Sequence, residues 1–176
     1  MSKKLVIWTD ASSKIVCKEP SKAYVPVTTT GFVIKHSKLP PLIGSNVHYG
    51  IYNSTGELRA GIESLRALTE YCDCLGINSK NYRVEMKTDF EYLKTVINSN
   101  VVSSDNNKKR RLLNKLKGLQ KTFKSVKCDE IERISNIAHN VCTFRMKDVV
   151  YKENDRGIVR DFYEIYENPS TCVIKI

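Results

Sequence analysis

The chain has no long apolar run, and this absence argues against a membrane-spanning segment. A helix that crosses a bilayer needs about 20 mostly apolar residues, and no stretch of the 176 residues approaches that length. After Met1 to Lys4 the sequence passes directly into a strand-like pattern, without the apolar region or cleavage site of a signal peptide. We therefore expect a cytoplasmic protein that makes no contact with membranes.

Acidic residues are scarce relative to basic ones. The chain carries 29 Lys and Arg against 19 Asp and Glu, a formal charge of +10. Such an excess favours a polyanionic partner, nucleic acid ahead of an acidic membrane surface or protein. A charge that only keeps the protein soluble is the alternative. With 41% hydrophobic residues, no internal repeat and no low-complexity segment, the chain can form one ordinary folded domain.

The six cysteines lack the spacing of a structural zinc site. Cys72 and Cys74 form a Cys-x-Cys pair, but no second pair at zinc-ligand spacing follows. In an intracellular chain cysteines are most simply free thiols. We expect all six to be free, and the spacing does not favour a bound structural zinc ion.

The hydrophobic pattern predicts an α/β domain over residues 1–148 and a C-terminal extension over 149–176. Strands are expected at 4–9, 27–36, 46–52, 82–88 and 125–134, and helices at 57–74, 90–98, 108–123 and 136–148. The remaining segments are expected to be a long turn or irregular hairpin connection (11–26), loops (101–107 and 151–160) and a β-like chain end (172–176). The first three strands are adjacent and the others alternate with helices. We therefore predict a mixed five-stranded sheet, three strands antiparallel and the others parallel, with helices on both faces.

Three carboxylates stand where this order of elements would bring them together. Asp10 follows the first strand, Asp89 follows the fourth strand, and Glu57 begins the long helix. Converging carboxylates repel one another unless cations lie between them, so the joint pattern indicates a divalent-metal site. Each acid alone has a simpler interpretation: a turn residue at Asp10, a capping-box acid at Glu57 and a helix cap at Asp89.

The sequence around these acids resembles ribonuclease H of the bacterial and eukaryotic type, within the ribonuclease H-like superfamily, over roughly residues 4–148. Residues 8–12 (WTDAS) are similar to the family's T-D-G-S strand end. Residues 53–60 (NSTGELRA) are similar to its N-x-x-x-E-L-x-A helix start, and residues 88–92 (TDFEY) to its T-D-S-x-Y motif. Each motif is weak alone, but three in the correct order and on the correct elements are fairly specific.

This resemblance implies an endoribonuclease that cuts the RNA strand of RNA–DNA hybrids by two-metal-ion catalysis and leaves 5′-phosphate and 3′-hydroxyl ends. Asp10, Glu57 and Asp89 would hold Mg²⁺, with Mn²⁺ as the alternative ion. The family's fourth carboxylate falls on Asn140, whose amide oxygen can coordinate weakly but carries no charge. The neighbouring His139 would shuttle a proton. Either of these two could instead be an ordinary helix residue.

The resemblance also implies where nucleic acid would bind. Asn53 matches a family position that contacts 2′-hydroxyls in the minor groove. The family's glycine-rich hairpin and basic protrusion are missing, so the basic helix 108–123 would supply the phosphate contacts, unless it is only a solvated face. Its candidate residues are Lys108, Lys109, Arg110, Arg111 and Lys115. The expected partner is an RNA–DNA hybrid or another duplex, bound by a monomer.

Two other functions stay open. The amide at Asn140 and the missing hairpin glycines favour a weakened ribonuclease H-like module that binds nucleic acid or a partner protein without cutting. A related nuclease that acts on double-stranded RNA or branched DNA is the third possibility. Retention of all three core carboxylates favours the active ribonuclease, because a site that has lost its function is expected to lose its acids first.

Overall fold

The computed structural model describes residues 3–18, 23–36, 39–99 and 106–156. Its elements follow the predicted order of three strands, a helix, a strand, two helices, a strand and a helix. The strands are β1 (Lys3–Lys18), β2 (Ala23–His36), β3 (Leu39–Tyr49), β4 (Tyr82–Thr88) and β5 (Ser125–Glu130). The helices are α1 (Asn53–Cys74), α2 (Glu91–Asn98), α3 (Asn107–Gln120) and α4 (Ile137–Arg156), with short 3-10 turns η1 (Ser79–Asn81) and η2 (Arg133–Ser135).

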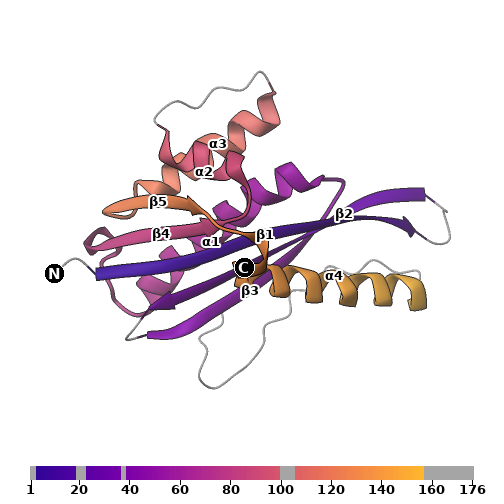
Figure 1. Ribbon diagram of the computed structural model, residues 1–176, viewed down its shortest axis with the longest axis horizontal. Coiled ribbons are helices and arrows are strands. Elements are labelled where there is room, and N and C mark those ends of the chain that lie inside the picture. The colour runs from indigo at the N-terminus through magenta and orange to yellow at the C-terminus, as the bar shows by residue number, and fades with distance from the viewer. Residues whose placement is uncertain (1–2, 19–22, 37–38, 100–105, 157–176) are drawn as a thin grey trace.

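The strands form the predicted mixed sheet, in the order β3-β2-β1-β4-β5 (Figure 1). β1, β2 and β3 pair antiparallel, whereas β4 pairs parallel with β1 and β5 parallel with β4. β1 is therefore the strand where the antiparallel and parallel halves meet. The carboxyl end of β4 lies beside the middle of β1, where Lys87 is opposite Trp8.

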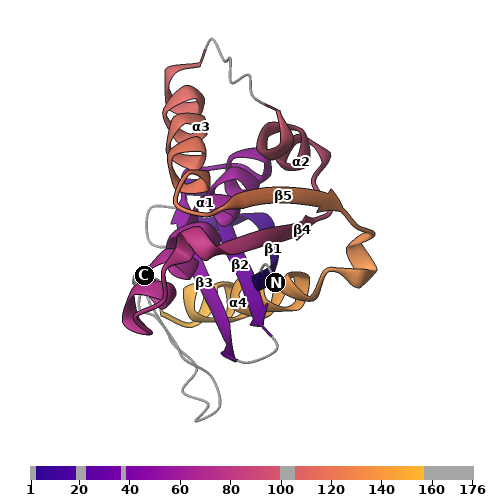
Figure 2. The ribbon, with the colours of Figure 1, turned by 90° about the vertical axis from the view of Figure 1, so that its left-hand side faces the viewer.

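Helices cover both faces of this sheet, as predicted. Successive residues of a strand point to opposite faces, and β2 shows the consequence directly. The hydroxyl of Thr30 donates to Glu63 of α1, whereas the hydroxyl of Thr29 donates to the carbonyl of Cys142 on α4, 2.8 Å away. α1 and α4 therefore lie on opposite faces, and α3 packs against α1 (Figure 2).

The main core lies between the sheet and α1. The apolar stripe expected on this helix is present, with Leu58, Leu65 and Leu68 all at most 1% exposed. They pack in one cluster with apolar residues of all five strands and of α2 and α3. Burial of this stripe is the main force that fixes α1 against the sheet, since full burial of each leucine stabilises the fold by roughly 1.5–3 kcal/mol.

The prediction of a long turn or irregular hairpin connection at residues 11–26 is wrong for residues 11–18 and 23–26, which are regular strand. β1 continues to Lys18 and β2 begins at Ala23, so the two strands form a long hairpin that α4 accompanies (Figure 1). A second apolar cluster explains the extension, because Val16 and Val27 of the hairpin pack with Met146 of α4. The sequence of the hairpin is too polar to predict strands by itself. The apolar side chain of α4 that stabilises these strands lies more than 100 residues further along the chain, so no local pattern reveals it.

Other element ends also differ from the prediction. β3 begins at Leu39 rather than at residue 46, and its prolines are tolerated because β3 is an edge strand. β5 ends at Glu130, and α4 runs on to Arg156, so the predicted loop at 151–160 is wrong for its helical part. Residues 157–176, with the predicted β-like end, lie outside the described residues, and the domain boundary at 148 stays a prediction.

Two expectations about the whole chain can be compared with the described residues. None of the described helices has both the length and the apolar character needed to cross a membrane. Four of the six cysteines are described as free thiols, and these are Cys72, Cys74, Cys128 and Cys142. For these four the predicted free state is confirmed.

Candidate metal centre

Asp10 and Asp89 are brought together by the parallel pairing of β1 and β4. Trp8 lies opposite Lys87 in this ladder. Two residues further along the chain are Asp10, still within β1, and Asp89, the first residue after β4. Asp10 is only 2% exposed and Asp89 is partly buried. Neither acid has the simpler role considered above. Asp10 lies within β1 rather than in a turn, and Phe90 is the cap residue of α2, without a side-chain bond.

Glu57 joins them from α1, which begins at Asn53 rather than at Glu57. The cap residue is Tyr52 and makes no side-chain capping bond, so the predicted capping box does not form. Gly56 lets the helix approach the sheet, because a Cβ atom there would lie 2.4 Å from the Thr28 side chain. Glu57 is consequently 3% exposed, and its Oε2 atom is buried with no hydrogen-bond partner among the described residues.

Burial and mutual repulsion hold these acids toward their neutral forms. Burial, together with the charges of Asp10 and Asp89, raises the pKa of Glu57 to about 9. Burial also raises the pKa of Asp10, and the hydrogen bond from His139 opposes that change. A buried carboxylate oxygen without a partner, beside two further carboxyl groups, fits a hard divalent cation that takes oxygen ligands. The three side chains could therefore hold such an ion.

Asn136 orients one of the three acids. Its Nδ2 donates both to the carbonyl of Thr9 and to Oδ1 of Asp89, each at 3.0 Å. Its own Oδ1 accepts from the N–H of Ala138 at 3.2 Å, at the start of α4. This one buried amide thus joins the middle of β1, the residue that follows β4 and the first turn of α4.

The face of α4 turned toward Asp10 carries His139 and Cys142. His139 Nδ1 lies 2.7 Å from Asp10 Oδ2, and the Cys142 thiol donates to the same oxygen at 3.2 Å. Asn140, by contrast, is exposed, and the structure does not bring it to the three acids. Cys142 is not among the residues that the sequence predicts for the site. The three-residue spacing from His139, which places both on one helix face, is the signal that could have found it.

Gly31 lies opposite Asp10 in the β1–β2 ladder and explains why α4 can come so close to Asp10. A Cβ atom on Gly31 would lie 2.8 Å from the backbone N of Cys142 and 3.0 Å from the carbonyl O of Ala138. Contacts that short require α4 to move, so only glycine permits this approach. The hydrogen bond from Thr29 to the carbonyl of Cys142 then holds the helix in place.

The residues expected to bind nucleic acid lie on α1 and α3. Asn53 is exposed at the first position of α1, where its Oδ1 accepts from Ser13 at 3.5 Å. On α3, Lys109 lies over the ring of Tyr92, with its Nζ atom 4.0 Å from the ring centroid. The other candidates on α3 are Lys108, Arg110, Arg111 and Lys115, and all four are exposed. No contact with a substrate tests these assignments, which stay predictions.

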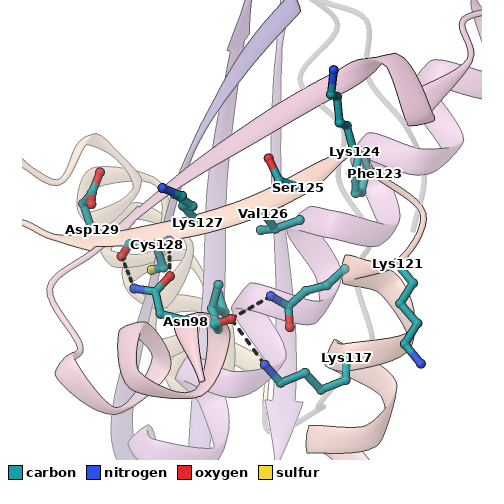
Figure 3. A pocket seen from close by; sticks show the side chains of 12 residues that line it. Asn98, Lys117, Lys121, Phe123, Lys124, Ser125, Val126, Lys127, Cys128 and Asp129 are labelled. Carbon is teal, nitrogen blue, oxygen red and sulfur yellow. Dashed lines mark hydrogen bonds between the residues drawn. The ribbon is translucent and has the colours of Figure 1, made fainter. Parts of the chain in front are cut away.

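A cavity of about 830 Å³ lies between α2, α3 and β5, and none of the three acids lines it. Figure 3 shows how polar side chains organise its walls. Asn98 accepts from the N–H of Cys128 and donates to its carbonyl, so it covers part of the free edge of β5 (Figure 3). Lys117 donates to the carbonyls of Val96 and Ser99 at the end of α2. Both side chains thus satisfy backbone groups, Asn98 at the edge of β5 and Lys117 at the carboxyl end of α2.

Comparison with known proteins identifies the fold. No protein-family model and no curated protein sequence matches the chain. Ribonuclease H1 from the halophilic archaeon Halobacterium salinarum NRC-1 is similar in structure, with a TM-score of 0.63 at 14% identity over 82% of this chain and 98% of that chain. LC11-RNase H1, isolated from compost and solved with an RNA/DNA hybrid, gives 0.60 at 18% identity over 78% and 92%.

A viral enzyme shows the same similarity. The foamy viral protease-reverse transcriptase in complex with dsDNA gives a TM-score of 0.51 at 15% identity, over 80% of this chain and 92% of that chain. At sequence identities this low, the structural similarity establishes the fold alone. The chain therefore has the ribonuclease H-like fold that the resemblance in its sequence implies.

Proposed function

We propose that this chain is an endoribonuclease that hydrolyses the RNA strand of RNA–DNA hybrids with divalent metal ions, Mg²⁺ first and Mn²⁺ as the alternative. The products would carry 5′-phosphate and 3′-hydroxyl ends. The observation that carries this proposal is the convergence of Asp10, Glu57 and Asp89 from three separate elements. The fold supports it, since ribonuclease H1 proteins share that fold and one was solved with an RNA/DNA hybrid.

In this proposal the protein residues act by position and charge. Divalent ions held there would supply the activation of water for attack on a phosphodiester and the stabilisation of the leaving oxygen. Asp10, Glu57 and Asp89 provide the oxygen ligands, and Asn136 fixes the orientation of Asp89. Because its raised pKa keeps Glu57 protonated at neutral pH, the carboxyl must lose that proton before it can act as a metal ligand.

The residues of α4 complete the site from the other face of the sheet. His139 holds Asp10 through the bond at 2.7 Å, and with its side chain 26% exposed it can pass a proton to or from solvent. Asn140 remains a candidate for the weak fourth ligand that the resemblance implies, from its exposed position next to His139.

The basic charge provides the attraction to substrate. The formal charge of +10 favours a phosphate polymer. In the proposal, the exposed Lys and Arg side chains of α3 contact phosphates, and Asn53 reads the 2′-hydroxyls that distinguish RNA from DNA. A monomer contains every one of these residues.

The test is cleavage of an RNA–DNA hybrid labelled on either strand, with Mg²⁺ or Mn²⁺ and with matched RNA–RNA and DNA–DNA duplexes. We expect cutting of the RNA strand of the hybrid only, and its loss in Asp10→Asn. Because the substitution is isosteric, circular dichroism should show an unchanged fold. Cleavage that persists in Asp10→Asn, or cleavage of DNA–DNA alone, would contradict the proposal.

One observation favours the second candidate function, a module that binds without cutting. On α4 the side chains that reach Asp10 are a histidine and a cysteine, and neither adds a carboxylate. This candidate requires no cleavage by the folded wild-type protein with either metal. Binding to the hybrid should then persist and weaken steeply as salt is raised.

A further inference from the structure

We propose that Asp10, His139 and Cys142 form a Zn²⁺ site that competes with the three-carboxylate site for Asp10. Ligand atoms from these three side chains all lie within 4.8 Å of one another. The set offers one oxygen, one imidazole nitrogen and one sulfur, which are the ligand types that Zn²⁺ takes in proteins. Zn²⁺ binding is argued from these atoms alone, whereas its inhibitory effect rests on the proposed function.

The backbone holds this cluster in place before any ion binds. His139 and Cys142 are three residues apart on α4, so both side chains lie on the helix face toward β1. Gly31 allows that helix to approach, and Thr29 anchors the carbonyl of Cys142 at 2.8 Å. Asp10 is fixed in turn, because its Oδ1 accepts from the N–H of Ala11 at 2.8 Å. Oδ2 is the atom left facing α4.

Only a small movement is needed to admit the ion. In tetrahedral Zn²⁺ coordination, oxygen and nitrogen ligands lie roughly 3.3 Å apart, and sulfur lies roughly 3.6 Å from either. The present distances from Asp10 Oδ2 are 2.7 Å to His139 Nδ1 and 3.2 Å to Cys142 Sγ. The cluster therefore has to open by about half an ångström, within the reach of side-chain rotation.

Two further groups suit such a site. Thr143 Oγ1 lies 3.4 Å from His139 Nε2, so it can accept the second ring N–H when Nδ1 holds the ion. Glu57, which interacts with Asp10, has a buried Oε2 with no partner among the described residues and can serve as the fourth ligand. Three ligands from the cluster and one from α1 make the four that Zn²⁺ prefers.

The cluster discriminates between ions by chemistry. Mg²⁺ prefers oxygen ligands in an octahedron, so it gains little from a thiol and an imidazole. Zn²⁺ binds both ligand types well, and once bound it occupies the Asp10 carboxylate, which the three-carboxylate site also needs. Occupation by Zn²⁺ should therefore exclude the Mg²⁺-bound, cleaving form of the same protein.

Co²⁺ is the probe that tests the site without any activity. Tetrahedral Co²⁺ bound to a thiolate gives a charge-transfer absorption that oxygen-only sites lack. We expect one Co²⁺ per full-length chain with this band, abolished by Cys142→Ser and retained by the matched control Cys74→Ser, which changes an exposed cysteine. Zn²⁺ should displace the Co²⁺. A wild-type protein without the band, or a band that Cys74→Ser removes, would overturn the proposal.

A second variant tests the site independently, in case Cys142→Ser does not fold. His139→Ala keeps the thiol and should weaken Zn²⁺ at least about tenfold, measured by competition with a chromophoric chelator. Unchanged Zn²⁺ affinity in His139→Ala would overturn the assignment of that ligand. In the cleavage assay, micromolar Zn²⁺ should inhibit the Mg²⁺-dependent reaction of the wild type. A protein that never cleaves refutes the proposed function, but the Co²⁺ spectrum still decides the metal site.

Discussion

Replacing Glu57 by Gln should stabilise the metal-free protein, although it changes a buried residue of the candidate site. The unfolded carboxyl loses its proton near pH 4.5, whereas the folded one keeps it until about pH 9. Between these values the folded state binds one more proton than the unfolded state, so its stability falls as pH rises. The slope from this one group is about 1.4 kcal/mol per pH unit, which gives about 4 kcal/mol at pH 7.5.

The assay is urea unfolding in EDTA at pH 5.5, 6.5, 7.5 and 8.5, with Glu57→Gln beside the wild type. Gln is uncharged at every pH, so the difference in unfolding free energy should grow with pH in favour of the variant. Glu63→Gln is the matched control on the same helix. Glu63 is paired, with Oε1 2.8 Å from His48, so this change should destabilise the protein instead.

Mg²⁺ provides the second half of the test. If the ion binds the Glu57 carboxylate, then Mg²⁺ should stabilise the wild type most at high pH and stabilise Glu57→Gln much less. The reasoning is refuted if Glu57→Gln is the less stable protein at pH 8.5 in EDTA. It is also refuted if the two proteins have the same pH slope.

Three further outcomes follow from the packing and the charge of the fold. Gly31→Ala should cut hybrid cleavage more than tenfold and lower the melting temperature, because the new Cβ atom would lie 2.8 Å from the backbone of α4. The control Gly118→Ala places its Cβ atom in open space and should stabilise α3 by about 0.5–1 kcal/mol. Asn98→Ala should cost about 1–3 kcal/mol in urea unfolding, since it frees two backbone groups of β5, and a loss under about 0.5 kcal/mol would contradict this. Replacing Lys108 and Arg111 by Gln should weaken hybrid binding. The slope of log K against log salt concentration should fall in magnitude by about one for each lost phosphate contact, and an unchanged slope would place the contacts elsewhere.

The sheet was predictable because its signals are local. Short apolar runs marked β4 and the first half of β1, and the period of the apolar stripe marked α1. The spacing of strands and helices then gave the antiparallel and parallel halves. The three acids could be found for the same reason, since Asp10 and Asp89 directly follow the apolar runs of β1 and β4, and Glu57 lies near the start of α1.

The long hairpin and the α4 side of the site were not predictable in this way. Val16 and Val27 form strands because Met146 packs against them, and no local pattern records a partner so distant in sequence. The choice of His139 rather than Asn140 to face Asp10 depends on the rotation of α4 about its axis. Gly31 sets that contact from another strand, and only three-dimensional structure reveals it.

The most direct measurement is anomalous diffraction from a crystal of the wild-type protein soaked in Mn²⁺. We expect manganese bound between the carboxylates of Asp10, Glu57 and Asp89, and its loss in Asp10→Asn. Manganese bound elsewhere while these three carboxylates stay empty would contradict the central claim that they form a divalent-metal site.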